Sequence, residues 1–499
     1  MRFLQLRFAV AAIGLVAAIA APSAQTLTVV RQPYLQQVTD RSAIVVWATR
    51  QSGLATARIN GRTFNAVSTR YSTTRTRLTY DYYQHEATIT GLTPSTSYPY
   101  ELRVNGIVAA LGSSIRTAPV NGSTRFIAFG DSGIGSTAQR DLASRMNADT
   151  FDFAVHLGDI AYGSTSTSGA ASYATYQSWF FDIYRDWLKR KAFFPSMGNH
   201  DSRPDNNNGR AYLDLFVLPD DAAAGAYPDH AERYYSFDYG PVHFVALDTE
   251  FAFQDPLRRQ AQIAWLRTDL SSTSKLWKIA FWHRAPYSSK GEHGSDLAVR
   301  QAFGPVMEQY GVQLALTAHE HTYDRTVPWR ESTSSARQAV TYVVSGGGGA
   351  RLYAAGFTTW TAYSLSFYHY LRVNVVDGCV LRTDTMDRYG VVRDAFTLDR
   401  CAQASDAGPP SVRITSPSNG RTVSGIVNIY ATATDDVRVE KVDFLIDGVL
   451  RKLDRTPTYL YSWDSRRVPA GKHTIQTRAH DIDGNRILST AITVTTTGS

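Results

Sequence analysis

The sequence has few cysteines and no run of more than three basic residues. Only two cysteines, Cys379 and Cys401, occur among 499 residues, so the chain is not a disulfide-rich scaffold. In an exported protein the two could pair, and two free buried thiols are the alternative. The formal charge is only +7 and the basic residues are scattered. The composition therefore indicates neither a nucleic-acid-binding domain nor attachment to an anionic membrane surface.

Apolar runs long enough to span a bilayer are also absent, and the longest run, residues 8–20, lies at the N-terminus. Arg2 and Arg7 precede apolar residues 8–20, and the small residues 21–24 follow. This pattern predicts a signal peptide at residues 1–24, cleaved after Ala24. A membrane anchor is the alternative, but the run is shorter than the ~20 residues that span a bilayer. We therefore expect a secreted protein, periplasmic or extracellular, with no membrane span.

The chain is too long for one domain and divides into three parts by its patterns. Residues 26–117 contain short β-branched and aromatic runs, which predict a β-sandwich. A proline-containing turn precedes Tyr98, which resembles the tyrosine corner of fibronectin type III domains. We expect a fibronectin III-like domain with no chemistry of its own.

The middle part has a different pattern. Residues 123–400 alternate apolar strands with helical stretches at 136–147 and 256–270, which predicts an α/β layered domain. A linker of small residues follows at 402–410. Residues 411–498 contain short strands separated by Asn-Gly and Asp-Gly turns, which resemble the Ig-like sandwiches at the C-termini of exported bacterial enzymes. The C-terminal domain could contact a cell surface or a carbohydrate.

Five apolar runs of the middle part end at polar residues that can bind metal ions. The carboxyl ends of parallel strands meet at one edge of a sheet, so residues distant in sequence would gather there. A single ending of this kind is usually a turn, but five in one domain favour a metal site. The endings lie at Asp131, Asp159, Asn199-His200, His283 and His319-Glu320-His321.

The types of side chain restrict the choice of metal. These endings contain no cysteine, which excludes thiolate zinc sites and iron–sulfur clusters. Carboxylate, imidazole and amide groups suit Zn, Mn, Fe or Mg. One ion cannot use so many donors and leave room for a substrate, whereas two ions about 3.5–4 Å apart can, particularly if one carboxylate bridges them.

The same endings carry a recognisable set of motifs. They read DSG (131–133), GDIAY (158–162), GNHD (198–201), AFWH (280–283) and AHEH (318–321). In this order they resemble the five-block signature of purple acid phosphatases, within the calcineurin-like metallophosphoesterases. Ala318 and Ala280 stand where that family usually has Gly and Val, and neither position supplies a ligand. A fibronectin-like domain before the catalytic domain is also the arrangement of that family.

The resemblance implies two metal sites with a shared carboxylate. One site would hold Fe(III), and the other a divalent ion, Fe, Zn or Mn. A Tyr162 phenolate suits a hard trivalent ion and would colour the protein, although a buried tyrosine with no metal is the alternative. The Fe(III) ligands would be Asp131, Asp159, Tyr162 and His321. The divalent ligands would be Asp159, Asn199, His283 and His319.

The expected activity is that of an acid phosphatase on small phosphate monoesters. Two ions would bind the phosphate oxygens and lower the pKa of a bound water, so that a metal-bound hydroxide attacks phosphorus. His200 and His293 match histidines of the family that contact phosphate and protonate the leaving group, although His293 lies in a polar stretch typical of a surface histidine. His156, inside an apolar run, is expected in the core.

Two other functions remain open from the sequence. Substrate selectivity resides in loops above the metals, so phosphodiesters, nucleotides or pyrophosphate are alternative substrates. A surface-binding protein with a degenerate catalytic domain is a further alternative, and its sign would be missing ligands. All seven ligand positions are occupied by suitable residues.

Overall fold

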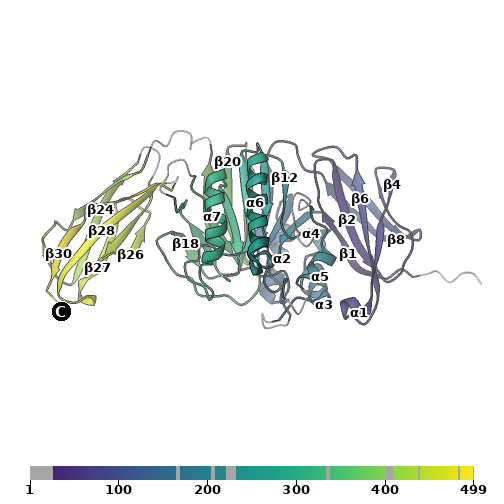
Figure 1. The fold of residues 1–499 in the computed structure, drawn as a ribbon, viewed down its shortest axis with the longest axis horizontal. Helices are drawn as coiled ribbons and strands as arrows, with labels where there is room; N and C mark the ends of the chain where they lie inside the picture. Colours follow the sequence, from purple (N-terminus) through teal and green to yellow (C-terminus); the bar gives the residue numbers. More distant parts are fainter. Residues whose placement is uncertain are drawn as a thin grey trace, which may run out of the picture.

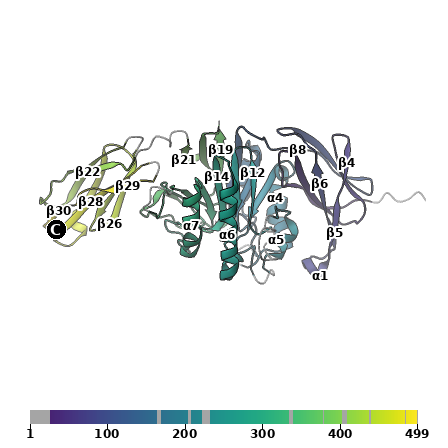
Figure 2. The same ribbon diagram turned by 45° about the horizontal axis from the view of Figure 1, so that its top comes forward.

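A computed structural model describes residues 26–163, 169–203, 208–220, 232–332, 338–376, 378–400, 408–435, 439–481 and 484–497. The predicted signal peptide, residues 1–24, and most of the predicted linker lie outside the described residues. Cys379 is disulfide-bonded. Cys401, the only other cysteine of the chain, lies outside the described residues. Three parts follow one another in a row, with the N-terminal part and the C-terminal part at opposite ends (Figures 1 and 2).

The N-terminal part is rich in β-structure, as its β-branched and aromatic runs predict. Trp47 and Leu102 are fully buried between its sheets. The hydroxyl of Tyr98 accepts a hydrogen bond from the Thr93 backbone N–H at 2.9 Å, which is the contact that a tyrosine corner makes. The elements are β1 (Val29–Gln36), β2 (Ser42–Thr49), β3 (Ala55–Ile59), β4 (Arg62–Asn65), β5 (Val67–Tyr71), α1 (Thr73–Thr76), β6 (Tyr82–Thr90), β7 (Ser97–Val104) and β8 (Ile107–Arg116).

One sheet runs from this N-terminal part into the central domain. Strand β1 pairs in parallel with β11 (Ala192–Ser196), with Leu35 opposite Ala192. The resulting ten-stranded sheet has the order β21-β20-β19-β9-β10-β11-β1-β2-β6-β5. Its other central strands are β9 (Thr124–Phe129), β10 (Phe153–Leu157), β19 (His369–Val376), β20 (Val380–Asp387) and β21 (Val392–Asp399). The two parts are therefore joined by backbone hydrogen bonds as well as by side-chain packing.

A second sheet of seven strands faces the first one in the central domain. Its order is β12-β13-β14-β15-β17-β16-β18. Phe153 and Phe244, one from each sheet, meet edge to face with ring centroids 5.2 Å apart, which places an aromatic core between the sheets. The strands are β12 (Tyr235–Tyr239), β13 (Val242–Ala246), β14 (Trp277–Arg284), β15 (Leu314–Ala318), β16 (Tyr323–Thr326), β17 (Thr341–Ser345) and β18 (Thr361–Leu365).

Helices cover the outer faces of the central domain. The predicted helices at 136–147 and 256–270 are α2 (Thr137–Ala148), capped by Ser136, and α6 (Pro256–Ser272), capped by Asp255. Helix α6 lies beside α7 (Leu297–Tyr310) over the seven-stranded sheet (Figure 1). The others are α3 (Tyr173–Tyr176), a π-helical turn (Gln177–Phe181), α4 (Asp182–Leu188), α5 (Arg210–Leu215) and a 3-10 turn (Ala252–Gln254). Among the described helices, none combines the length and the apolar character that a membrane crossing requires.

The C-terminal domain is a second all-β unit with its own core. Its two sheets have the orders β22-β24-β27 and β23-β30-β28-β25-β26, with β29 paired to β28. Phe444 and Trp463 are buried between them. The strands are β22 (Ser411–Ser416), β23 (Thr422–Val423), β24 (Ile426–Thr434), β25 (Val439–Ile446), β26 (Val449–Asp454), β27 (Tyr459–Asp464), β28 (Gly471–Asp481), β29 (Arg486–Leu488) and β30 (Ile492–Thr496).

The C-terminal domain makes specific contacts with the central domain. Lys441 on β25 is fully buried, and its Nζ donates to the carbonyl oxygen of Thr359 at 2.9 Å. The guanidinium of Arg486 lies 4.0 Å from the ring centroid of Trp329. A buried amine and a cation–π contact fix the side chains on both sides of this boundary.

Candidate metal centre

The seven predicted ligands come from the ends of strands in both central sheets. Strands β9, β10 and β11 are parallel neighbours in one sheet, and β14 and β15 are parallel neighbours in the other. Their carboxyl ends lead into the polar residues, so the sheet geometry brings the residues to one rim. Alternation along β14 places Ile279 and Phe281 in the core between the sheets. His283 lies at the irregular end of this strand, with its Nε2 3.5 Å from Asp159 Oδ2.

The backbone at three of these residues has an unusual conformation. Asp131, Asp159 and His319 have φ values of 54°, 52° and 71°. Residues other than glycine rarely adopt positive φ, and such strained positions cluster at functional sites. The turns direct each side chain back over the end of its strand, toward the same space.

Asp131, Tyr162 and His321 form one group of donors. The Tyr162 hydroxyl donates to Asp131 Oδ1 at 3.3 Å and lies 3.2 Å from His321 Nε2. All three side chains are buried. Burial raises the pKa of Tyr162 well above its usual range, and the charges of Asp131 and Asp159 raise it further. A phenolate at this position therefore requires a bound cation.

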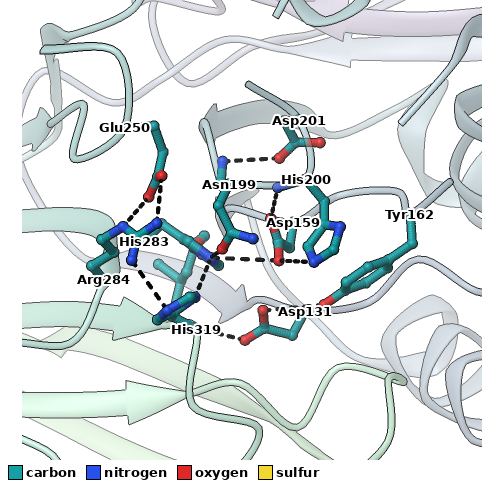
Figure 3. Close-up of polar contacts among 12 residues, drawn as sticks. Asp131, Asp159, Tyr162, Asn199, His200, Asp201, Glu250, His283, Arg284 and His319 are labelled. Atoms are coloured by element: carbon teal, nitrogen blue, oxygen red, sulfur yellow. Dashed lines mark hydrogen bonds and ion pairs between the residues drawn. The ribbon is translucent and has the colours of Figure 1, made fainter. Parts of the chain in front are cut away.

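Asp159, Asn199, His283 and His319 form the second group (Figure 3). His283 Nε2 is 3.0 Å from Asn199 Oδ1, 3.1 Å from His319 Nδ1 and 3.5 Å from Asp159 Oδ2. The two groups meet at the carboxylates, since Asp131, Asp159 and His283 offer ligand atoms that all lie within 4.8 Å of one another.

The histidines are oriented by bonds to the backbone. His283 Nδ1 lies 2.9 Å from the Leu157 carbonyl oxygen, and His321 Nδ1 lies 2.6 Å from that of Arg351. Both rings therefore turn Nε2 toward the carboxylates, as metal-binding histidines do. Burial alone would lower the pKa of His283, but Asp159 raises it to about 10. A cation bound between these groups would take the place of that proton.

These observations fit a pair of metal ions. Two ionisable carboxylates are buried side by side, imidazole nitrogens face them, and a phenol and an amide oxygen complete the set. Carboxylate, imidazole and phenol donors without thiolates match Fe, Zn or Mn. Burial would raise the pKa of Asp159, but His283 and His200 outweigh it and hold the pKa well below its usual range. The carboxylate is thus ionised and able to bind.

Residues behind the ligands hold the loops together. Asp201 Oδ2 accepts from the backbone N–H of Gly198 at 2.9 Å and of Ile160 at 3.2 Å, which joins two ligand-bearing loops. Burial, followed by the charge of Asp159, raises the pKa of Asp201 to about 7. Asp201 therefore lies behind the donors, where it orients the two loops.

The two predicted catalytic histidines lie on either side of the donors. The His200 ring centroid is 4.5 Å from that of Tyr162, and its backbone N–H donates to Asp159 Oδ1 at 2.8 Å. His293 is exposed, yet its ring stacks on His319 with centroids 4.2 Å apart. Partial desolvation of the stacked ring, followed by the charges of His321 and Arg284, lowers the pKa of His293. His156 is fully buried in the core, as its apolar run predicts.

Several contacts of the site are not apparent from the sequence. Glu320 is buried and accepts the backbone N–H of His293 at 2.8 Å, which fixes the His293 loop. A Cβ at Gly291 would lie 1.7 Å from Glu320 Oε2, so only glycine allows this approach. Tyr353 stacks on His321 with centroids 4.1 Å apart. Glu320 is part of the AHEH motif, whereas Tyr353 carries no sequence signal.

Ala318 stands where the related family usually has Gly, and a neighbouring strand leaves room for its methyl group. A Cβ added to Gly130, at the end of β9, would lie 2.5 Å from the Ala318 Cβ. Gly130 therefore leaves the space that the Ala318 methyl group fills, so the turns that carry Asp131 and His319 can lie close together.

Comparison with known families identifies two of the three parts. Residues 124–323 match the calcineurin-like phosphoesterase family, and residues 410–476 match the bacterial Ig domain family. A purple acid phosphatase isolated from yellow lupin (Lupinus luteus) seeds shares the fold, with a TM-score of 0.63 at 20% identity over 74% of each chain.

Sequence relatives are consistent with this result. Acid phosphatase type 7 of Danio rerio is 27% identical over 385 residues, which cover 65% of this chain and 79% of the relative. Purple acid phosphatase 15 of Arabidopsis thaliana is 28% identical over 273 residues, 48% of this chain and 49% of the relative. An uncharacterized protein of Mycobacterium tuberculosis is 27% identical over 278 residues, 49% of this chain, and only 51% of that relative is spanned. The chain is thus a homologue of purple acid phosphatases that carries a calcineurin-like phosphoesterase domain and a bacterial Ig domain.

Proposed function

We propose that the protein is a secreted acid phosphatase that hydrolyses phosphate monoesters at a binuclear Fe(III)–M(II) centre. The observation that carries the proposal is the convergence of seven donors in two groups that meet at Asp131 and Asp159. Secretion rests on the N-terminal pattern of residues 1–24, which lie outside the described residues.

The seven donors would be shared between two ions. Asp131, Tyr162 and His321 would hold Fe(III), Asn199, His283 and His319 the divalent ion, and Asp159 both. When bound, the ions would supply the positive charge that binds phosphate oxygens and activates water. The backbone N–H of His200 donates to Asp159 Oδ1 at 2.8 Å, which fixes the shared carboxylate.

His200 and His293 would act on the substrate from opposite sides. His200 Nδ1 lies 2.7 Å from the Gly169 carbonyl oxygen, so its Nε2 turns toward the carboxylates and lies 3.9 Å from Asp159 Oδ2. His293 is exposed and held over His319 by the Glu320 bond to its backbone. An exposed imidazole at the rim can deliver a proton to a leaving oxygen. Its lowered pKa means that it gives up this proton at a lower pH than an ordinary histidine does, so an acid role requires acidic solution.

The Tyr162→Phe variant tests the ferric assignment. The unmodified protein is expected to absorb visible light through charge transfer from the Tyr162 phenolate to Fe(III), and the variant to lose the band. Absorption spectra with elemental analysis of iron, zinc and manganese would measure both. A colourless protein with full activity would refute the ferric assignment while leaving a metal-dependent phosphoesterase in place.

The His293→Ala variant tests the proton donor. Alkyl phosphates need a protonated leaving group and are expected to be hydrolysed about 100-fold more slowly. Hydrolysis of p-nitrophenyl phosphate, whose leaving group is a stable anion, should slow much less. His473→Ala in the C-terminal domain is the control. Equal loss on both substrates would argue against an acid role for His293.

Phosphodiesters, nucleotides and pyrophosphate remain alternative substrates, which a panel of esters assayed across pH would separate. The degenerate-domain alternative has less support, because all seven predicted ligand positions carry side chains that can bind metal. A relative that is 24% identical to this chain is named a probable inactive purple acid phosphatase of Arabidopsis thaliana. Contact of the C-terminal domain with a cell surface or a carbohydrate stays a prediction from its sequence.

A further inference from the structure

Arg284 lies at the rim of the donor cluster. It follows His283 at the end of β14, where the register to β15 shifts and Arg284 comes opposite Ala318. Its Nη1 atom is 3.4 Å from His319 Nε2. In Figure 3 the guanidinium lies between Glu250 and His319. The Arg284 side chain is 31% exposed, so solvent and solutes reach it.

A buried carboxylate holds this guanidinium in one orientation. Glu250 Oε1 accepts from Arg284 Nε at 2.8 Å, and Oε2 accepts from Nη2 at 2.9 Å. The Glu250 side chain is only 5% exposed. Such two-point pairs fix the planar guanidinium as well as attracting it.

The loop that carries Glu250 is itself fixed. Asp248, fully buried after β13, accepts the backbone N–H groups of Glu250 at 2.8 Å, Phe251 at 3.1 Å and Ala252 at 3.0 Å. Thr249 Oγ1 accepts the backbone N–H of Arg284 at 3.3 Å. The arginine is thus supported by a rigid second layer, as preorganised binding groups are.

The two nitrogens of His319 show on which side of the donor cluster Arg284 lies. His319 Nδ1 faces His283 Nε2 at 3.1 Å, whereas Nε2 faces Arg284. Arg284 is therefore on the outer side of the imidazole, one ring away from the donors. Since Glu250 occupies Nε and Nη2, the N–H groups of Nη1 are the ones directed along the rim. A phosphoryl group held by the donors would lie on the Nδ1 side of the His319 imidazole. The next part of the substrate would lie on the Nε2 side, next to Arg284.

We propose that Arg284 binds a second anionic group of the substrate and thereby increases the activity of the site on phosphoanhydrides such as inorganic pyrophosphate and nucleoside diphosphates. This inference rests on the proposed phosphatase centre and assigns a residue to the phosphoanhydride substrates that remain alternatives to monoesters. A guanidinium stays charged at every physiological pH and forms strong hydrogen bonds to phosphate oxygens. Glu250 serves as a positioning residue, because it holds Arg284 and does not reach the substrate.

The test compares Arg284→Gln with the unmodified metal-loaded protein on three substrates. The loss in kcat/KM is expected to be at least about 10-fold larger for pyrophosphate and for ADP than for p-nitrophenyl phosphate, as one charge-assisted hydrogen bond predicts. Arg284→Lys keeps the charge but not the fork with Glu250, and should recover part of the difference. Arg70→Gln, which breaks an arginine–aspartate pair with Asp81 in the N-terminal part, should leave the ratio unchanged.

A binding measurement separates this inference from the proposed function. Calorimetry with pyrophosphate and with orthophosphate should show that Arg284→Gln weakens pyrophosphate binding about 10-fold more than orthophosphate binding, at equal metal content and melting temperature. Equal weakening of both anions, or no weakening, would overturn the role of Arg284. If the unmodified protein hydrolyses no phosphate compound, the proposed function fails, and the binding result still decides the inference. Loss with pyrophosphate alone, and not with ADP, would overturn the nucleotide part.

Discussion

Asp159→Ala is expected to lose bound metal and to reduce phosphatase turnover by more than about 1000-fold. The side chain is 2% exposed, and its Oδ2 lies 3.5 Å from His283 Nε2. It is the one carboxylate that belongs to both groups of donors in the proposed centre. Loss of an outer partner of a ligand typically costs 10–100-fold in metal affinity or activity, and loss of a shared ligand costs more. The variant also leaves His283 without the carboxylate that raises its pKa.

Metal content by elemental analysis and turnover of p-nitrophenyl phosphate would measure the two losses separately. Asp186→Ala, which removes an aspartate that is 60% exposed on α4, is the control for general effects of the substitution. Asp159→Asn keeps the shape of the side chain but not its charge, and should fail in the same way if the charge bridges two ions. Hydrolysis at the unmodified rate in Asp159→Ala would refute the bridging role.

The positions of the donors could be predicted because they depend on local rules. An apolar strand that ends at a polar residue delivers that residue to the sheet edge, and five strands do so here. The assignment of His319 and His321 to different groups is not local: it depends on the turn at His319, with φ of 71°, and in the sequence it came from the family resemblance alone.

Tertiary pairs lie beyond the sequence patterns. Glu250 and Arg284 are 34 residues apart and meet because β13 and β14 are neighbours in one sheet. The pairing of β1 with β11 likewise joins segments that the composition separates into two domains. In both cases the partner depends on which strands lie side by side, and apolar periodicity describes each strand without its neighbours.

Asp443→Ala is expected to destabilise the C-terminal domain by about 3–5 kcal/mol, the range for breaking a buried ion pair. Asp443 on β25 is fully buried, and two cationic side chains and one histidine surround it. Lys441 Nζ is 3.1 Å from Oδ1, and Arg478 Nη2 and His480 Nε2 lie 2.9 and 3.0 Å from Oδ2. Removal of the carboxylate leaves Lys441, itself without exposed surface, as an uncompensated buried amine.

The pH of the experiment follows from the direction of the pKa shift. Burial would raise the pKa of Asp443, but Lys441 and His480 lower it below its ordinary value of 3.8. The stabilisation is therefore fully present above that value and is lost as the pH falls through the lower pKa of the folded state. Calorimetry of the full chain at pH 7 should show that the C-terminal domain of the variant unfolds at a lower temperature than that of the unmodified protein.

Arg466→Ala provides the comparison within the same domain. It breaks a pair with Asp464 in which the arginine is 54% exposed, and exposed pairs contribute about 0–1 kcal/mol. If Asp443→Ala costs no more than Arg466→Ala, the buried cluster does not stabilise the domain. The variant should also weaken the boundary with the central domain, because Lys441 donates to the carbonyl oxygens of Thr359 and Thr361. Those residues precede and begin β18, so the charge that Asp443 balances also fixes the contact between the two domains.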